Sequence, residues 1–222
     1  MPMLALVFAS VVCLALVFAR MAWTGNVNRY GFLIWNLFLA WLPLVFALLA
    51  DDEHRGEPRT NWRFRSLAVA WLLFFPNAPY ICTDLFHLTS RFSGHFWVEL
   101  VIILSCAFTG LVLGFVSLYL MHGIVMRAFG RAVSWLFVAA IAALSGFGIY
   151  LGRFLRFNSW DVLFKPVALF HGIGRWAATP LSDPGSLALP VLFATFLFIS
   201  YLMLYALTHL QHVAPVQLPK RA

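Results

Sequence analysis

Polar side chains that could bind a ligand are concentrated in one stretch that two prolines interrupt. Asn77 lies between Pro76 and Pro79, and Asp84 and His87 follow three residues apart. The prolines end a helix and leave backbone carbonyls without helical partners. If a short helix follows, Asp84 and His87 share one of its faces, where a carboxylate can orient an imidazole or share a metal ion with it.

Metal binding is one chemistry that this stretch could support. His95 and Glu99 repeat the pairing of an imidazole with a carboxylate at the spacing of one helical turn. Together with Asp84 and His87 they supply ligand types that suit zinc. The sequence has no HExxH-like run that would support such a site. We therefore predict no bound metal and no cofactor, and these four residues remain the candidate ligands if a metal is bound.

A second stretch combines two arginines with polar neighbours. Arg153 and Arg156 would share one face of a helix, and two guanidinium groups there could hold a phosphate or a carboxylate. The alternatives are that they pair with Asp84, Glu99 or Asp161, or that they reach out to lipid headgroups. We expect Asp84 or Glu99 to pair with an arginine, because an unpaired buried carboxylate is costly.

The composition shows which elements must position these side chains. The chain has 222 residues, of which 63% are hydrophobic and only 10% are charged, whereas a soluble domain carries about 25% charged residues. Lipid must replace water over much of the surface, and backbone groups in lipid must be satisfied internally. The apolar runs do not alternate, which predicts an all-α, polytopic membrane helix bundle.

The net charge of +7 would suggest nucleic acid as a partner of a soluble protein. Here the arginines flank apolar segments and suit anionic headgroups. We therefore predict the lipid bilayer, and not nucleic acid, as the partner.

Six apolar segments are long enough to span a membrane. We place them at about 3–20, 31–50, 66–81, 97–121, 132–152 and 187–209. The first lacks a preceding basic residue and is expected to be an uncleaved span. An apolar but interrupted stretch at 161–176 predicts an interfacial or re-entrant helix. The predicted domains are one transmembrane domain over 1–213 and a short basic tail over 214–222, with both termini cytoplasmic.

Alternating span direction brings the candidate ligand residues to one end of the bundle, which we predict to be extracytoplasmic. Ionisable residues at membrane depth cost about 2.5–3.5 kcal/mol each, so they are usually paired or face a cavity. A network that only fixes helix register is the alternative to a binding site. The candidates are Asn36, Asn77, Tyr80, Asp84, His87, Glu99, Arg153, Arg156, Asn158, Trp160 and Asp161.

Small residues recur at helical spacing on the fourth and fifth predicted spans. Gly110 and Gly114 lie on the fourth, and Gly148 and Gly152 lie on the fifth. Such faces allow helices to approach closely in lipid, so we expect these two spans to meet through Gly114 and Gly148.

Three of these runs together resemble a known family. They are Trp35–Pro43, Pro76–Leu88 with its Pro-Asn-Ala-Pro-Tyr and Thr-Asp-Leu-Phe-His-Leu segments, and Arg153–Asp161. The chain resembles, over nearly its whole length, the bacterial membrane proteins grouped as domain of unknown function 1361. The resemblance implies a multi-pass protein of the bacterial inner membrane. It implies no activity and no catalytic residues.

Two classes of function remain open. The sequence has no P-loop, no Rossmann glycine pattern and no nucleophile elbow, so catalytic residues are unknown. We expect a membrane protein of unassigned activity whose polar end binds an anionic lipid headgroup or a small anion. The alternative is a membrane-embedded hydrolase or transferase that acts on a lipid or a lipid-linked substrate, with or without a metal.

Overall fold

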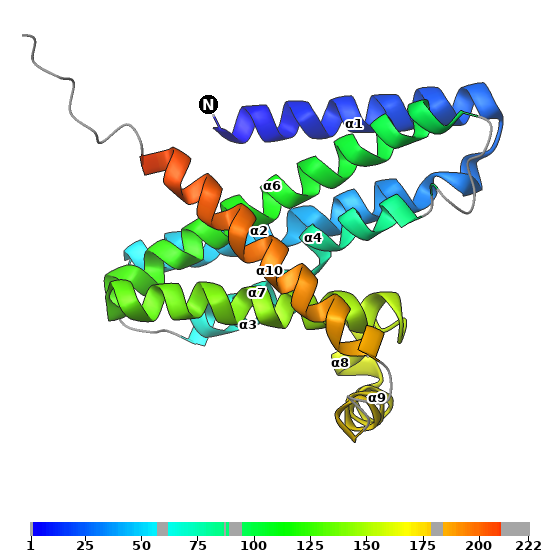
Figure 1. The fold of residues 1–222 in the computed structure, drawn as a ribbon. Coiled ribbons are helices and arrows are strands. Elements are labelled where there is room, and N and C mark those ends of the chain that lie inside the picture. Colours follow the sequence, from blue (N-terminus) through cyan, green and yellow to red (C-terminus); the bar gives the residue numbers. More distant parts are fainter. Residues whose placement is uncertain (1, 57–61, 87, 89–94, 179–183, 210–222) are drawn as a thin grey trace, which may run out of the picture.

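The computed structural model describes residues 2–56, 62–86, 88, 95–178 and 184–209 (Figure 1). Within these ranges every regular element is a helix, which confirms the all-α prediction. Six helical segments are long and apolar enough to cross a membrane. The chain is therefore a multi-pass membrane protein.

Five of the six spans are continuous helices. They are α1 (Pro2–Thr24), α2 (Gly31–Gly56), α6 (Phe96–Phe129), α7 (Arg131–Arg153) and α10 (Pro184–His209). The short 3₁₀ turn η1 (Val27–Arg29) joins the first two. The remaining span is broken into α3 (Trp62–Phe74), α4 (Asn77–Tyr80) and the 3₁₀ helix η2 (Ile81–Phe86). Its described path continues beyond the predicted end at 81, because the chain resumes helical turns after Pro76 and continues them to Phe86.

The outer surface of the spans is apolar, as a lipid solvent requires. Phe8 on α1 and Leu136 on α7 are each 70% exposed. Inside the bundle, α2 packs against α3 and α6, and α7 packs against α10. Buried apolar side chains form two clusters, one shared mainly by α1, α2 and α6 and the other by α3, α6, α7 and α10.

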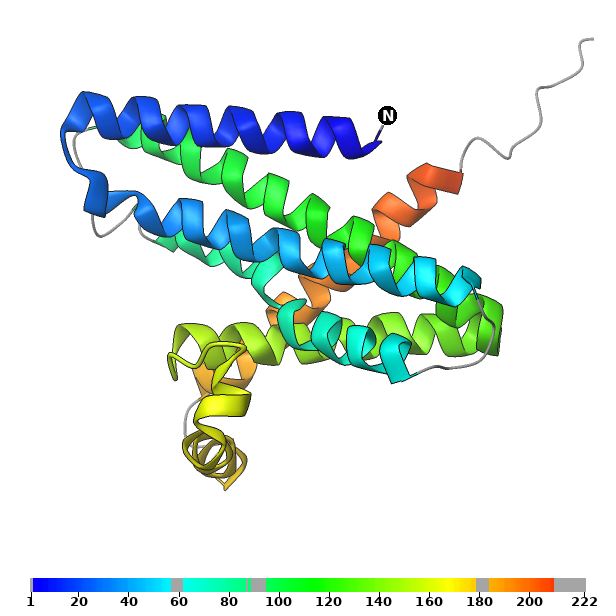
Figure 2. The ribbon, with the colours of Figure 1, turned by 180° about the vertical axis from the view of Figure 1, so that it is seen from behind.

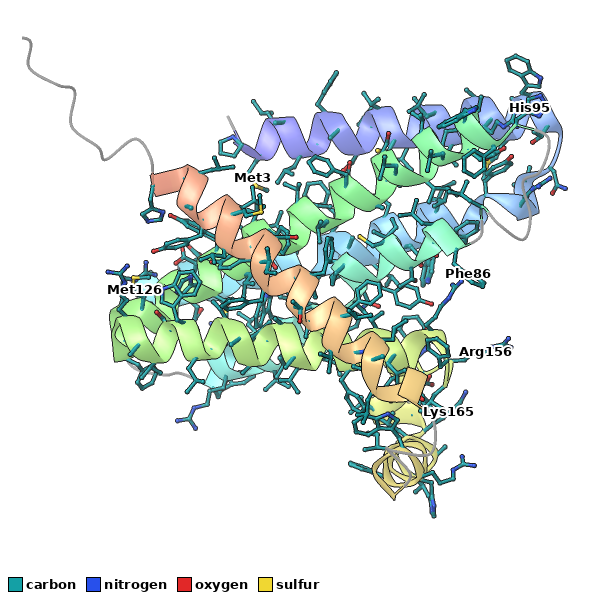
Figure 3. The ribbon with its side chains drawn as sticks, viewed as in Figure 1. Met3, Phe86, His95, Met126, Arg156 and Lys165 are labelled. Carbon is teal, nitrogen blue, oxygen red and sulfur yellow. The ribbon has the colours of Figure 1, made fainter. Side chains whose placement is uncertain are left out.

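The two ends of the bundle differ in the residues they gather. The start of α1 and the end of α10 lie at the same end in both opposite views (Figures 1 and 2). Figure 3 shows Phe86, His95, Arg156 and Lys165 at the opposite end, and Met126 far from them. We call the end with Phe86, His95 and Arg156 the polar end. Its existence follows from alternating span direction.

Gly114 of α6 and Gly148 of α7 pack against the broken span and not against each other. A Cβ on Gly114 would lie 2.9 Å from the Cβ of Ala78, and a Cβ on Gly148 would lie 2.9 Å from Cγ of Pro76. α6 and α7 do contact each other, as predicted, but the prediction that they meet through Gly114 and Gly148 is wrong. The proline-interrupted segment occupies the space that these glycines leave open.

The connection between α7 and α10 contains two further helices. They are α8 (Asp161–Phe164) and α9 (Pro166–Ala178), which confirms helical structure in the stretch predicted at 161–176. Figure 1 views α9 almost along its axis while α7 lies across the view, so α9 runs roughly perpendicular to α7. This direction suits a helix that lies in the membrane interface.

Candidate functional site

A cavity of about 570 Å³ lies among α2, the broken span, α7 and the chain that follows α7. The broken span contributes the polar side chains of Asn77, Tyr80 and Asp84, which lie on the short helices α4 and η2 that follow Pro76. The predicted candidates that line this cavity are Asn36, Asn77, Tyr80, Asp84, Arg153 and Asn158. Alternating span direction therefore brings side chains from several distant parts of the sequence to one cavity.

Asp84 is the buried charge of this cavity. Asp84 is only 2% exposed. It lies on η2, which packs beside α2. The Nδ2 group of Asn36 donates a hydrogen bond of 2.7 Å to Oδ2 of Asp84. Because a carboxylate only accepts, the orientation of the Asn36 amide is fixed by this bond.

Arg153 is the cationic group of the cavity. It is the last residue of α7 and is partly buried. Its Cζ atom lies 5.2 Å from the centre of the Phe86 ring, a distance at which a guanidinium is attracted to the ring. It also attracts the Asp84 carboxylate electrostatically. The negatively charged Asp84 and the positively charged Arg153 therefore line the same cavity.

The segment after α7 is held in place by two side chains. Asn77 donates from Nδ2 to Oγ of Ser159 at 2.9 Å and to the carbonyl of Phe74 at 3.0 Å. Asp161 does not line the cavity; its Oδ2 accepts the backbone N–H of Asn158 at 2.7 Å. These bonds fix the chain that forms one wall.

Trp160 is also outside the lining. Its ring lies edge-on to that of Trp35, with the centroids 6.3 Å apart, and Trp35 itself lines the cavity. Trp160 therefore contacts a residue of the cavity wall without lining the cavity itself.

Glu99 belongs to a different cluster, which corrects its predicted place in the shared site. Its Oε1 accepts hydrogen bonds from Nε of Arg20 at 2.8 Å and from the hydroxyl of Tyr30 at 2.7 Å. The Arg20 Nη2 atom is 2.7 Å from the same oxygen. This ion pair confirms that Glu99 pairs with an arginine, but the arginine comes from α1. Glu99 meets α1 because the first turn of α6 packs against the end of α1.

Tyr30 completes the Glu99 cluster. Burial and the neighbouring Glu99 carboxylate raise the pKa of Tyr30 above its ordinary value. The phenol therefore stays protonated and donates. Sequence reasoning missed both Arg20 and Tyr30; the available signal was an arginine at the end of an apolar helix, where a bulky charge needs a partner.

Arg156 does not join Arg153, so the predicted two-arginine site is not formed. The helix ends at Arg153, and Arg156 is exposed with a φ of 57°. Figure 3 shows its side chain pointing away from the bundle. The shared helical face assumed from the spacing does not exist, because α7 stops three residues too early.

The candidate metal ligands are not brought together in the described part of the chain. Asp84 and Glu99 lie in separate clusters, and His95 is an exposed residue at the start of α6. His87 lies outside the described residues. Among the residues that the structure describes, no group of three or more His, Cys, Asp and Glu side chains could hold a metal ion.

Apart from Ser145 and Ser159, the rest of the cavity wall consists of apolar residues and glycines, which sequence reasoning did not identify. Two of its leucines, Leu72 on α3 and Leu144 on α7, are 40% and 51% exposed. Both lie within segments long and apolar enough to span a membrane. Part of the apolar lining is therefore exposed along the membrane-spanning segments.

Comparison with known proteins gives one match. No curated protein and no solved structure matches the chain. The family model described as "Protein of unknown function (DUF1361)" matches residues 35–203, a range that includes every described residue of the cavity wall except Phe32. The chain therefore belongs to the DUF1361 family of proteins of unknown function.

Proposed function

We propose that this protein binds a membrane lipid, an amphiphilic molecule whose headgroup carries a phosphate or carboxylate group, in the cavity at its polar end. The observation that carries the proposal is the combination of an arginine and several amides with an apolar wall that includes exposed leucines of two membrane-spanning segments. Arg153 supplies the charge for a phosphate or carboxylate. Leu72 and Leu144 supply the surface for the attached chains.

The size of the cavity supports an amphiphile. Its volume of about 570 Å³ falls within the range of roughly 300–1,000 Å³ that is usual for small-molecule sites. That space holds a headgroup and the first carbons of its chains, and the remaining chain length extends into the bilayer. A small anion alone would leave the apolar wall without a partner.

Binding is favoured over transport by the position of the polar residues. Transporter sites usually lie near the middle of the bilayer between discontinuous helices. Here Asp84 and Arg153 lie at the end of their spans. Toward the opposite end of the bundle, the polar ring of the buried His122 is satisfied within the protein, by hydrogen bonds with Tyr201 at 2.8 Å and Ser134 at 3.1 Å.

A reaction is not part of the proposal. The two serines that line the cavity are engaged in ways that do not suggest a nucleophile: Ser145 donates to the carbonyl of Ile141 at 2.7 Å, and Ser159 accepts from Asn77 at 2.9 Å. Within the described part of the chain, neither serine has a base as a hydrogen-bond partner, and a serine nucleophile needs one.

We further propose that the protein resides in the bacterial inner membrane with its polar end extracytoplasmic. The family resemblance supports the membrane. The basic residues near the other end support the orientation, because short cytoplasmic loops are rich in arginine. Arg127 and Arg131 flank the turn at Gly130 there, and Arg127 lies 3.1 Å from Asp51.

Native mass spectrometry of the protein extracted from membranes tests the binding proposal. The wild type is expected to retain a phospholipid. Arg153→Gln should weaken retention by roughly 10- to 150-fold, the equivalent of the 1.5–3 kcal/mol of a hydrogen bond to a charged group. Arg175→Gln is the matched control, because Arg175 is exposed on α9 and does not line the cavity. Equal retention by both variants would contradict the proposal.

A further inference from the structure

The hydrogen bonds around the cavity leave it rich in acceptors. Asn36 uses its Nδ2 group on Asp84, and Asn77 uses its Nδ2 group on Phe74 and Ser159. In each case the partner atom is an oxygen that accepts, so the amide orientation follows from chemistry. The side-chain oxygens of both asparagines remain as acceptors on residues that line the cavity.

Asp84 adds a charged acceptor to this set. Its Oδ2 atom accepts from Asn36, and no described residue donates a hydrogen bond to its Oδ1 atom. A carboxylate has about four acceptor sites, so one amide donor leaves it mostly unsatisfied. Oδ1 of Asp84 is not among the described side-chain atoms that are sealed from solvent without a partner, whereas Oε2 of Glu99 is. Because Asp84 lines the cavity, its Oδ1 atom is accessible from there.

A buried carboxylate in this state calls for a donor from the ligand. Arg153 attracts Asp84 electrostatically, and this attraction offsets part of the cost of burying the charge. Electrostatic attraction does not supply hydrogen bonds to the carboxylate oxygens of Asp84. Asp84 is only 2% exposed, and acceptor sites without a donor are costly in an apolar surrounding. A positively charged hydrogen-bond donor would pair with the charge of Asp84 and also fill its empty acceptor sites.

We propose that the headgroup bound in this cavity is zwitterionic, with a phosphate held by Arg153 and a primary ammonium held by Asp84. The inference rests on the proposed binding of an amphiphile and names its headgroup class, a phosphoethanolamine-type headgroup. A primary ammonium has three N–H donors. Asp84 and the side-chain oxygens of Asn36 and Asn77 offer three acceptors for them.

Aromatic side chains near these acceptors suit the same cation. Phe32 and Trp35 line the cavity on α2 beside Asn36. A cation is attracted to the face of such rings. A headgroup that carries hydroxyls in place of the ammonium would gain the hydrogen bonds but not this attraction or the charge pairing.

Lipid competition in nanodiscs tests the headgroup class on the unmodified protein. The probes are phosphatidylethanolamine, phosphatidylcholine, phosphatidylglycerol and phosphatidic acid with identical acyl chains. We expect phosphatidylethanolamine to be retained at least tenfold better than phosphatidylcholine, because a trimethylated ammonium donates no hydrogen bond. We expect the same preference over phosphatidylglycerol and phosphatidic acid, which lack the ammonium.

An Asp84→Asn variant adds a second comparison. It should lose the preference for phosphatidylethanolamine and still bind phosphatidic acid through Arg153.

Equal binding of phosphatidylethanolamine and phosphatidylcholine by the wild type would overturn the zwitterion inference, as would better binding of phosphatidylglycerol. In either case Arg153-dependent lipid binding would still support the proposed function. If no phospholipid is retained, or if Arg153→Gln changes none of them, the proposed function fails together with the inference.

Discussion

Removal of Arg20 should destabilise the bundle more than removal of any exposed arginine. Arg20 is 8% exposed and Glu99 is 1% exposed, and both Nε and Nη2 of Arg20 contact Oε1 of Glu99 at 2.8 and 2.7 Å. In Arg20→Met, the Tyr30 hydroxyl would be the one donor left to Glu99 among the described residues, where its Oε2 atom already lacks a hydrogen-bond partner. The loss should be about 3–5 kcal/mol, the usual cost of breaking a buried ion pair on one side.

The assay is reversible unfolding in mixed micelles, followed by circular dichroism. Arg20→Met/Glu99→Leu should recover most of the loss, because replacing both charges with apolar side chains removes the unpaired carboxylate. Arg175→Met serves as the control, since Arg175 is exposed on α9. The reasoning is refuted if Arg20→Met stays within about 1 kcal/mol of the wild type, or if the double variant is less stable than the single one.

Three further outcomes are expected. Gly146→Ala should destabilise the α7–α10 contact by about 1–3 kcal/mol because its Cβ would overlap the Pro190 carbonyl, whereas Gly174→Ala, with no described atom within 4 Å, should be neutral or slightly stabilising; thermal unfolding that ranks them the other way would exclude this packing. Arg156→Gly should stabilise the protein by about 1 kcal/mol, since a φ of 57° strains a side chain that has a Cβ; a loss of stability would show that the arginine makes a contact that compensates. Single cysteines at Phe129 and Lys165, in a background without the native cysteines, should react with impermeant reagents from opposite sides of the membrane; labelling from the same side would remove the six-span topology.

The number of spans and the polar end follow from the sequence for clear physical reasons. A membrane span needs about 20 apolar residues whatever its neighbours are. Alternation of span direction then assigns each loop to an end of the bundle without any knowledge of packing. Asn77 and Arg153 could be placed at the same end on this basis alone.

Lateral neighbours could not be derived in the same way. Several arginines reach the end where Glu99 lies, and only the packing of α1 against α6 selects Arg20 as its partner. The glycine faces likewise predict a close approach but not the helix that approaches. Gly114 and Gly148 both accommodate the broken span, because the side chains of Ala78 and Pro76 lie against them.

The predicted fifth span ends at 152, one residue before the end of α7 at Arg153. The expectation that the helix continues to Arg156 was wrong, because the apolar pattern runs on through Phe154, Leu155 and Phe157 while the helix does not. The left-handed conformation at Arg156 usually belongs to glycine. Sequence spacing therefore placed two arginines on one face, whereas the chain turns and separates them.

A crystal structure grown with a phospholipid brominated on its acyl chains tests the central proposal most directly. If the cavity binds a lipid, anomalous bromine peaks should continue from the space between Leu72 and Leu144, and phosphate density should lie within hydrogen-bonding distance of the Arg153 guanidinium. Bromine peaks confined to the outer faces of the spans, with water alone around Arg153, would contradict it.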